Sequence, residues 1–178
     1  MVKSDKNYKN LLYYWDTCVF LAWIQDEDNR TPEEKAGLAD IALKIHKNEA
    51  RLVTSGITKG EILKSTLSKD GIEKLDALFK RKNFDWVQTE LRVYDIMHDI
   101  RDYYQKIKDT ENLPTVTQAD SIHLASAIWI EADEFHTFDE NDKKRKRRAL
   151  LPLSGNVAGK YNLVIKKPGL AQQSLGLI

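Results

Sequence analysis

This sequence has a single cysteine, no long apolar run and almost no net charge. Cys18 is the single cysteine among 178 residues, so no disulfide can form within the chain, as is typical of proteins from a reducing compartment. No apolar run approaches the roughly 20 residues that a membrane-spanning helix needs. Residues 1–10 are polar and lack the apolar core of a signal peptide. These absences predict a cytoplasmic protein that makes no membrane contact.

Charge of neither sign dominates the chain. Lys and Arg together number 28, and Asp and Glu together number 27. The net charge therefore argues neither for nor against a nucleic-acid partner, and only the distribution of charge can do so. No internal repeat or shift in composition marks a second domain. A chain of this length predicts a single domain, which we place at residues 1–168, followed by a flexible tail at residues 169–178.

Short apolar runs alternate with amphipathic segments along the chain. We expect strands at residues 11–15, 51–55 and 83–87, a short one that ends with 136–138, and one at 161–165. We expect helices at residues 17–24, 32–48, 56–67 and 72–80, a long one from 89 onward, and one at 118–131. Strands separated by helices predict βαβ units and a parallel sheet. In the long helix, the residues expected to pack in the core are Leu91, Tyr94, Ile96, Ile100 and Tyr104.

One carboxylate interrupts the most apolar segment of the chain, "LLYYWDTCVFLAWI" at residues 11–24. A buried, unpaired carboxylate is costly because an ionised group loses its hydration. Asp16 therefore either caps the helix that follows it, where Asp is a favoured residue, or faces a cation.

Three further acids are expected near Asp16. Parallel sheets place ligands beyond the carboxyl ends of their strands. Asp139 follows the fourth strand, Asp120 lies one turn into the helix at 118–131, and Glu61 lies on the helix after the second strand. Converging carboxylates repel one another unless protons or cations intervene. Their oxygens favour Mg²⁺ or Mn²⁺, which can activate water and steady the charge on a phosphate. The pattern predicts metal-assisted cleavage of a phosphodiester.

Each acid also has an ordinary interpretation. Glu61, with lysines nearby, is a surface glutamate by default. Asp120 can cap its own helix, although Thr117 is the better cap candidate. Asp139 can be a turn residue, and Asp142 is then its rival as a ligand. For Asp16 alone the cap is the better interpretation, but with three other acids expected at the same edge the metal interpretation is favoured, and one residue can do both.

Other chemically versatile residues are expected to be structural. A lone histidine such as His123 is more often structural than catalytic, and a carboxylate site needs no histidine. Cys18 is expected to be a buried, inert thiol rather than a nucleophile. The tryptophans are expected in the core, although exposed ones could stack on bases: Trp15, Trp23, Trp86 and Trp129.

Four segments in this order, "YYWDTCVF", "SGITKGEIL", "TQADSIHLASA" and "HTFDEND", resemble the PIN-domain nucleases, including the VapC-type toxins of toxin–antitoxin pairs. The resemblance covers roughly residues 11–165. It implies a three-layer α/β/α sandwich with a central parallel sheet, and a divalent-metal ribonuclease. It places the acidic, catalytic quartet on Asp16, Glu61, Asp120 and Asp139. Asp16, Asp120 and Asp139 would hold Mg²⁺ or Mn²⁺, with Glu61 as a further ligand or an orienting group.

The resemblance also implies supporting groups and partners. Thr137 would supply a hydroxyl that supports the site, and Thr17 follows the first acid. RNA would be cut to a 5′-phosphate and a 3′-hydroxyl, an antitoxin protein would bind beside the site, and the enzyme would form a homodimer. The sequence departs from the family pattern after Asp139, where Glu140 and Asp142 are rival ligands.

Six basic residues in succession follow the last proposed ligand. They are either a solvated loop or contacts to a phosphate backbone that guide a polyanion to the site: Lys143, Lys144, Arg145, Lys146, Arg147 and Arg148. Two alternatives to the ribonuclease stay open. One is a non-catalytic module of the same fold that binds RNA or a protein. The other is a DNA nuclease, because contacts to the 2′-hydroxyl cannot be seen in a sequence.

Overall fold

The computed structural model describes residues 10–25, 30–63, 66–140 and 147–169. The strands are β1 (Leu11–Trp15), β2 (Ala50–Ser55), β3 (Phe84–Val87), β4 (Glu134–His136) and β5 (Ile165–Lys166). The helices are α1 (Thr17–Gln25), α2 (Pro32–His46), α3 (Ile57–Glu61), α4 (Lys69–Phe79), α5 (Leu91–Glu111) and α6 (Gln118–Trp129), with a 3-10 turn, η2, at Leu151–Leu153. The strands form one sheet in the order β3-β2-β1-β4-β5, and every neighbouring pair is parallel.

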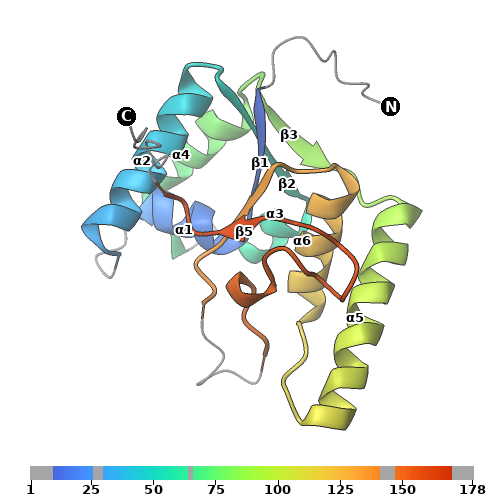
Figure 1. Ribbon diagram of the computed structural model, residues 1–178. Helices are drawn as coiled ribbons and strands as arrows, with labels where there is room; N and C mark the ends of the chain where they lie inside the picture. The colour runs from blue at the N-terminus through green and yellow to red at the C-terminus, as the bar shows by residue number, and fades with distance from the viewer. Residues whose placement is uncertain (1–9, 26–29, 64–65, 141–146, 170–178) are drawn as a thin grey trace, which may run out of the picture.

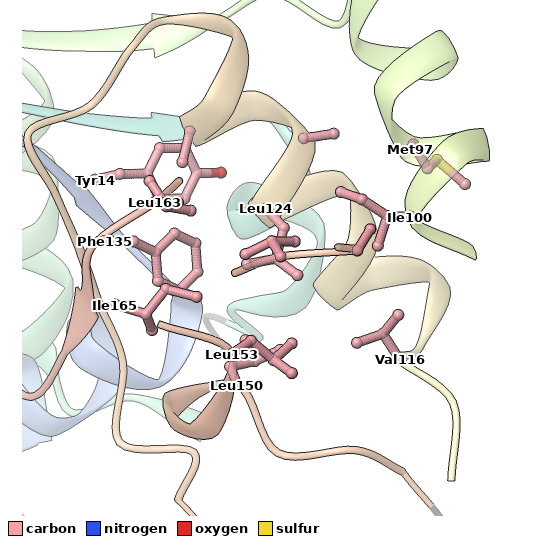
Figure 2. Close-up of a cluster of buried hydrophobic side chains, with 14 of the residues drawn as sticks. Tyr14, Met97, Ile100, Val116, Leu124, Phe135, Leu150, Leu153, Leu163 and Ile165 are labelled. Carbon is pink, nitrogen blue, oxygen red and sulfur yellow. The ribbon is translucent and has the colours of Figure 1, made fainter. Parts of the chain in front are cut away.

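Helices cover both faces of the sheet (Figure 1). Successive side chains of a strand point to opposite faces. Tyr14 of β1 and Phe135 of β4 point to the face covered by α5 and α6, where their rings stack 5.2 Å apart and pack with Leu124 and Ile100 (Figure 2). Trp15, the next residue along β1, packs on the opposite face with residues of α1, α2 and α4. The predicted three-layer α/β/α sandwich with a central parallel sheet is therefore confirmed.

Side-chain caps fix where several helices begin. Thr31 and Glu34 form a reciprocal capping box at α2, and Pro32 occupies the first helical position. Thr117 caps α6, as the sequence predicts. At α4 the cap is Ser68, so the helix begins earlier than the predicted residue 72. None of the helices in the described ranges has both the length and the apolar character of a membrane span.

Two predicted elements are shorter than expected. The helix predicted at residues 56–67 ends at Glu61, where Ile62 takes an extended conformation. The strand predicted at residues 161–165 begins only at Ile165, because Tyr161 pairs with Val157 across a tight local turn instead of with β4.

The long helix α5 packs with one face only. Ile100 and Tyr104 are buried as predicted, and Ile96 is partly buried. Leu91 and Tyr94 were expected in the core, but their exposed fractions are 76% and 50%. The prediction is wrong for both, because they occupy the outer side of the first turns of α5.

Candidate active site

Three of the four predicted acids follow neighbouring strands, and the fourth lies on a helix that packs against one of these strands. Asp16 comes directly after β1, Asp139 comes three residues after β4, and Glu61 ends α3, which follows β2. Asp120 lies in the first turn of α6, which packs against β2. Because β2, β1 and β4 are adjacent and parallel, their carboxyl ends meet at the same edge of the sheet.

Thr137 links the first and last acids of the site. Its hydroxyl donates to Asp16 Oδ2 at 2.8 Å, and its oxygen accepts a hydrogen bond from the Asp139 backbone N–H at 3.1 Å. The Cys18 thiol also lies 3.3 Å from Asp16 Oδ2. Burial and the charge of Asp16 raise the pKa of Cys18 well above its usual range. The thiol therefore stays protonated and supports Asp16 as a donor rather than acting as a nucleophile.

Asp120 is held by the cap of its own helix. The Thr117 hydroxyl accepts from the Asp120 backbone N–H at 3.1 Å and donates to Asp120 Oδ2 at 2.6 Å. The same carboxylate oxygen lies 2.8 Å from Arg147 Nη1, which also lies 2.9 Å from Asp139 Oδ2. Burial opposes the charge of Arg147, but Asp120 and Asp139 raise the pKa of its guanidinium above the usual value. One cationic nitrogen therefore joins two of the predicted metal ligands.

Glu61 is joined to the site by Thr17 and His123. The Thr17 hydroxyl donates to Glu61 Oε2 at 2.5 Å, and His123 Nε2 lies 3.0 Å from the same oxygen and 3.7 Å from Asp16 Oδ1. His123 Nδ1 lies 2.9 Å from the Tyr14 hydroxyl. Burial alone would lower the pKa of His123, but Tyr14, Glu61 and Asp16 raise it to about 10. Burial likewise opposes the charge of Glu61, whose pKa is lowered by His123 and Thr17.

The acids differ in their access to solvent. The side chains of Asp16, Asp120 and Asp139 are at most 10% exposed, whereas the side chain of Glu61 is 35% exposed. The three aspartates therefore form the buried part of the site, and Glu61 lies at its open side.

Two members of this arrangement were not assigned to it from the sequence. His123 was expected to be structural, although its position three residues after Asp120 on one helix places both on the same helical face. Arg147 was predicted as a phosphate contact within the basic run, and the structure places its guanidinium against Asp120 and Asp139. No signal in the run itself separates Arg147 from its neighbours.

The rest of the basic run and the rival acids have different surroundings. Arg148 donates from Nε to the Pro114 carbonyl at 3.0 Å, and its guanidinium lies 4.9 Å from the Tyr104 ring centre. Glu140 pairs with Lys167 at 2.6 Å. Asp142 and the predicted phosphate contacts Lys143, Lys144, Arg145 and Lys146 lie outside the described residues.

The donor chemistry of the site fits a hard divalent ion. Asp16, Asp120 and Asp139 offer buried carboxylate oxygens, the ligands that Mg²⁺ and Mn²⁺ take. Within the ranges that the structure describes, no three His, Cys, Asp or Glu side chains are arranged around one point as ion ligands. In this conformation a guanidinium nitrogen instead contacts two of the three aspartates. These aspartates would hold the ion.

A family profile described as the PIN domain matches residues 13–148, which is most of the chain. The chain belongs to the PIN domain family. The matched range of this PIN domain contains all four predicted acids together with His123 and Arg147.

The fold of this PIN domain is also found among solved structures, whereas no curated protein matches its sequence. It is similar to a chain in the crystal structure of VapBC2 from Rickettsia felis bound to a DNA fragment from their promoter. The TM-score is 0.54 and the sequence identity is 15%, over 88% of this chain and 98% of that chain. At this identity, the similarity concerns the fold.

Proposed function

We propose that this PIN domain is a divalent-metal-dependent endoribonuclease that hydrolyses RNA phosphodiester bonds. The observation that carries the proposal is that the buried carboxylates of Asp16, Asp120 and Asp139 lie together at the carboxyl edge of the sheet, where Thr137 links Asp16 to Asp139 and Arg147 links Asp139 to Asp120. When bound there, Mg²⁺ or Mn²⁺ supplies positive charge for the phosphate and activates water.

The chain's own residues prepare the site for this chemistry. Thr137 and Thr117 each donate a hydrogen bond to an aspartate and so fix the direction of its free lone pairs. Thr17 and His123 hold Glu61 in its ionised form at the open side of the site. Glu61 is the acid best placed to orient incoming water or to act as a further ligand. Such preorganised groups need little rearrangement during the reaction.

A role as the toxin of a toxin–antitoxin pair is the finer form of this proposal. The similarity in fold to a chain of VapBC2 supports it, since that chain comes from a two-component complex. The proposal then includes an antitoxin protein as the partner, a homodimeric enzyme, and action in the cytoplasm on RNA.

One observation favours a second candidate, a non-catalytic PIN-like module that binds RNA or a protein. Asp120 and Asp139 already have a cationic partner in Arg147, and a site neutralised in this way needs no ion in order to be stable.

A cleavage assay separates the two candidates. We would incubate the protein with single-stranded and structured RNAs, and with matched DNA, in Mg²⁺, Mn²⁺ or EDTA. The ribonuclease predicts metal-dependent cleavage of RNA. Asp16→Asn should lower it more than roughly 100-fold, because even the outer partners of metal ligands contribute about 10- to 100-fold.

Asp95→Asn is the matched control, since Asp95 is exposed on α5 away from the site. It should leave the activity unchanged, and circular dichroism should show that both variants are folded. Absence of cleavage in every condition, with RNA binding retained, would establish the binding module instead. Cleavage of DNA alone would contradict the choice of RNA.

A further inference from the structure

Arg147 belongs to a run of basic residues, but its side chain contacts the acids of the site instead of facing solvent alone. Its Nη1 atom lies 2.8 Å from Asp120 Oδ2 and 2.9 Å from Asp139 Oδ2, and both carboxylates are buried. The contact to Asp120 is a charge-assisted hydrogen bond, a class that is among the strongest in proteins, and the contact to Asp139 is an ion pair. A single nitrogen therefore occupies the space between two of the three proposed metal ligands.

The backbone around Arg147 is anchored by its neighbour. The Arg148 backbone N–H donates to the Thr115 carbonyl at 2.8 Å, and its side chain reaches Pro114 and lies over Tyr104. Thr115 lies in the loop just before the Thr117 cap of α6. The chain is thus fastened beside the helix that carries Asp120, which directs the Arg147 side chain into the site.

We propose that Arg147 is a built-in counter-ion of the acidic site, which joins Asp120 and Asp139 in the ion-free protein and competes with the divalent ion for the same oxygens. This inference rests on the proposed metal site, and it states that Arg147 controls how readily the divalent ion binds there. Binding of the ion requires the Arg147 side chain to leave, so that Asp16, Asp120 and Asp139 can close around one point.

Electrostatics supports competition rather than coexistence. A guanidinium and a divalent cation repel each other strongly at contact distance in a partly buried site. The Arg147 side chain is 29% exposed, so it can turn toward solvent without unfolding the loop that Arg148 anchors.

The test measures Mn²⁺ affinity rather than activity. Free Mn²⁺ would be followed by electron paramagnetic resonance during titration of the full-length wild type, Arg147→Ala and Arg147→Gln. Removing the competing cation should tighten Mn²⁺ binding about tenfold, the effect of one charge-assisted contact. Arg101→Ala, which removes an exposed arginine of α5, is the matched control and should bind like the wild type.

A second measurement, of melting temperature, tests the inference even if one of the Arg147 variants is less stable than the wild type. The melting temperature of Arg147→Gln should fall in EDTA, and saturating Mn²⁺ should raise it by more than it raises the wild type. Equal or weaker Mn²⁺ binding by both Arg147 variants would overturn the inference and leave the metal site standing. Failure of every protein, the wild type included, to bind Mn²⁺ would instead overturn the proposed function, and the inference with it.

Discussion

The Tyr14 hydroxyl connects the sheet to the candidate site through a single atom. It accepts a hydrogen bond from the Ser55 backbone N–H at 3.0 Å and lies 2.9 Å from His123 Nδ1, with all three residues buried. The other ring nitrogen of His123 faces Glu61. Tyr14 therefore sets the orientation of the imidazole from the side opposite to the acids, as a supporting partner does for a liganding group.

Tyr14→Phe should destabilise the protein by about 1–3 kcal/mol, because it leaves the buried Ser55 N–H without its partner. Urea denaturation monitored by circular dichroism would measure the loss. Tyr161→Phe is the matched control, since the Tyr161 hydroxyl donates to the partly exposed Asp99 and water can replace it. Its cost should stay below about 1 kcal/mol. Equal losses in the two variants would contradict the role given to Tyr14.

Single residues differ in how far the sequence could predict their roles. The positions of Asp16 and Asp139 follow from the rule that parallel strands end at one edge, and Thr117 follows from cap preferences. His123 and Arg147 act through contacts with partners 62 and 27 positions away, respectively. No local pattern encodes such contacts, so only the folded chain reveals them.

At the level of elements, strand β4 is stabilised by the polar contacts of His136 and Glu134. The Trp15 indole N–H donates to His136 Nδ1 at 3.1 Å, so His136 carries its proton on Nε2 and donates it to Glu134 at 2.9 Å. Lys166 of β5 pairs with the other Glu134 oxygen at 2.7 Å. Three neighbouring strands are thus linked through His136 and Glu134 of β4, just before the segment that carries Thr137 and Asp139.

Glu134 and His136 make the stability of the protein depend on pH. Burial raises the pKa of Glu134, but His136 and Lys166 outweigh burial and lower it from 4.5 to about 2. A lowered carboxyl pKa contributes stability that is present above pH 4.5 and is lost as the pH falls toward 2. Burial also lowers the pKa of His136, so the folded state resists protonation at this position too, and acid destabilises it from about pH 6.5 downward.

Glu134→Gln should therefore cost about 2 kcal/mol at pH 7 and about half of that or less at pH 3, because most but not all of the contribution is lost there. Thermal unfolding at half-unit steps between pH 3 and pH 7 would show the two melting curves converging as the pH falls. Glu49→Gln, at an exposed site, should match the wild type throughout. A difference that stays constant with pH would show that the charge of Glu134 does not contribute to stability.

Elements with strong local signals were predicted well, and elements defined by their partners were not. The strand at Leu11–Trp15 and the capped helix α2 carry their signals in their own residues. Strand β5 is only two residues long because its ladder with β4 starts at Ile165. An apolar stretch at residues 161–165 looks like a strand in isolation, so its true start depends on where the chain reaches the sheet.

For the whole molecule, the balance of charge matters for how a polyanion would reach the site. The formal net charge is +1, so the molecule as a whole attracts RNA weakly, and the acids of the site repel it. Attraction must then come from local cations. Arg147 and Arg148 contact acids and the core, which leaves residues 143–146 as the part of the run proposed to contact the RNA backbone.

Replacing these four residues with Gln should flatten the salt dependence of RNA binding. Each lost contact to a single-stranded backbone reduces the slope of log Kd against log salt by about 0.7, so the slope should fall by about 2–3. Binding would be measured by fluorescence anisotropy in the Asp16→Asn background, which prevents cleavage. The variant is Lys143→Gln, Lys144→Gln, Arg145→Gln and Lys146→Gln.

The control makes the same change in net charge on and after α4, at Lys69, Lys74, Lys80 and Lys82, which are all exposed. Because both variants carry four fewer positive charges, net charge alone would lower their affinities equally. A contact at the site predicts instead that only the variant at residues 143–146 loses slope. Equal slopes of log Kd against log salt in the two variants would show that RNA binding depends on the total charge of the protein. The basic run would then be a solvated loop.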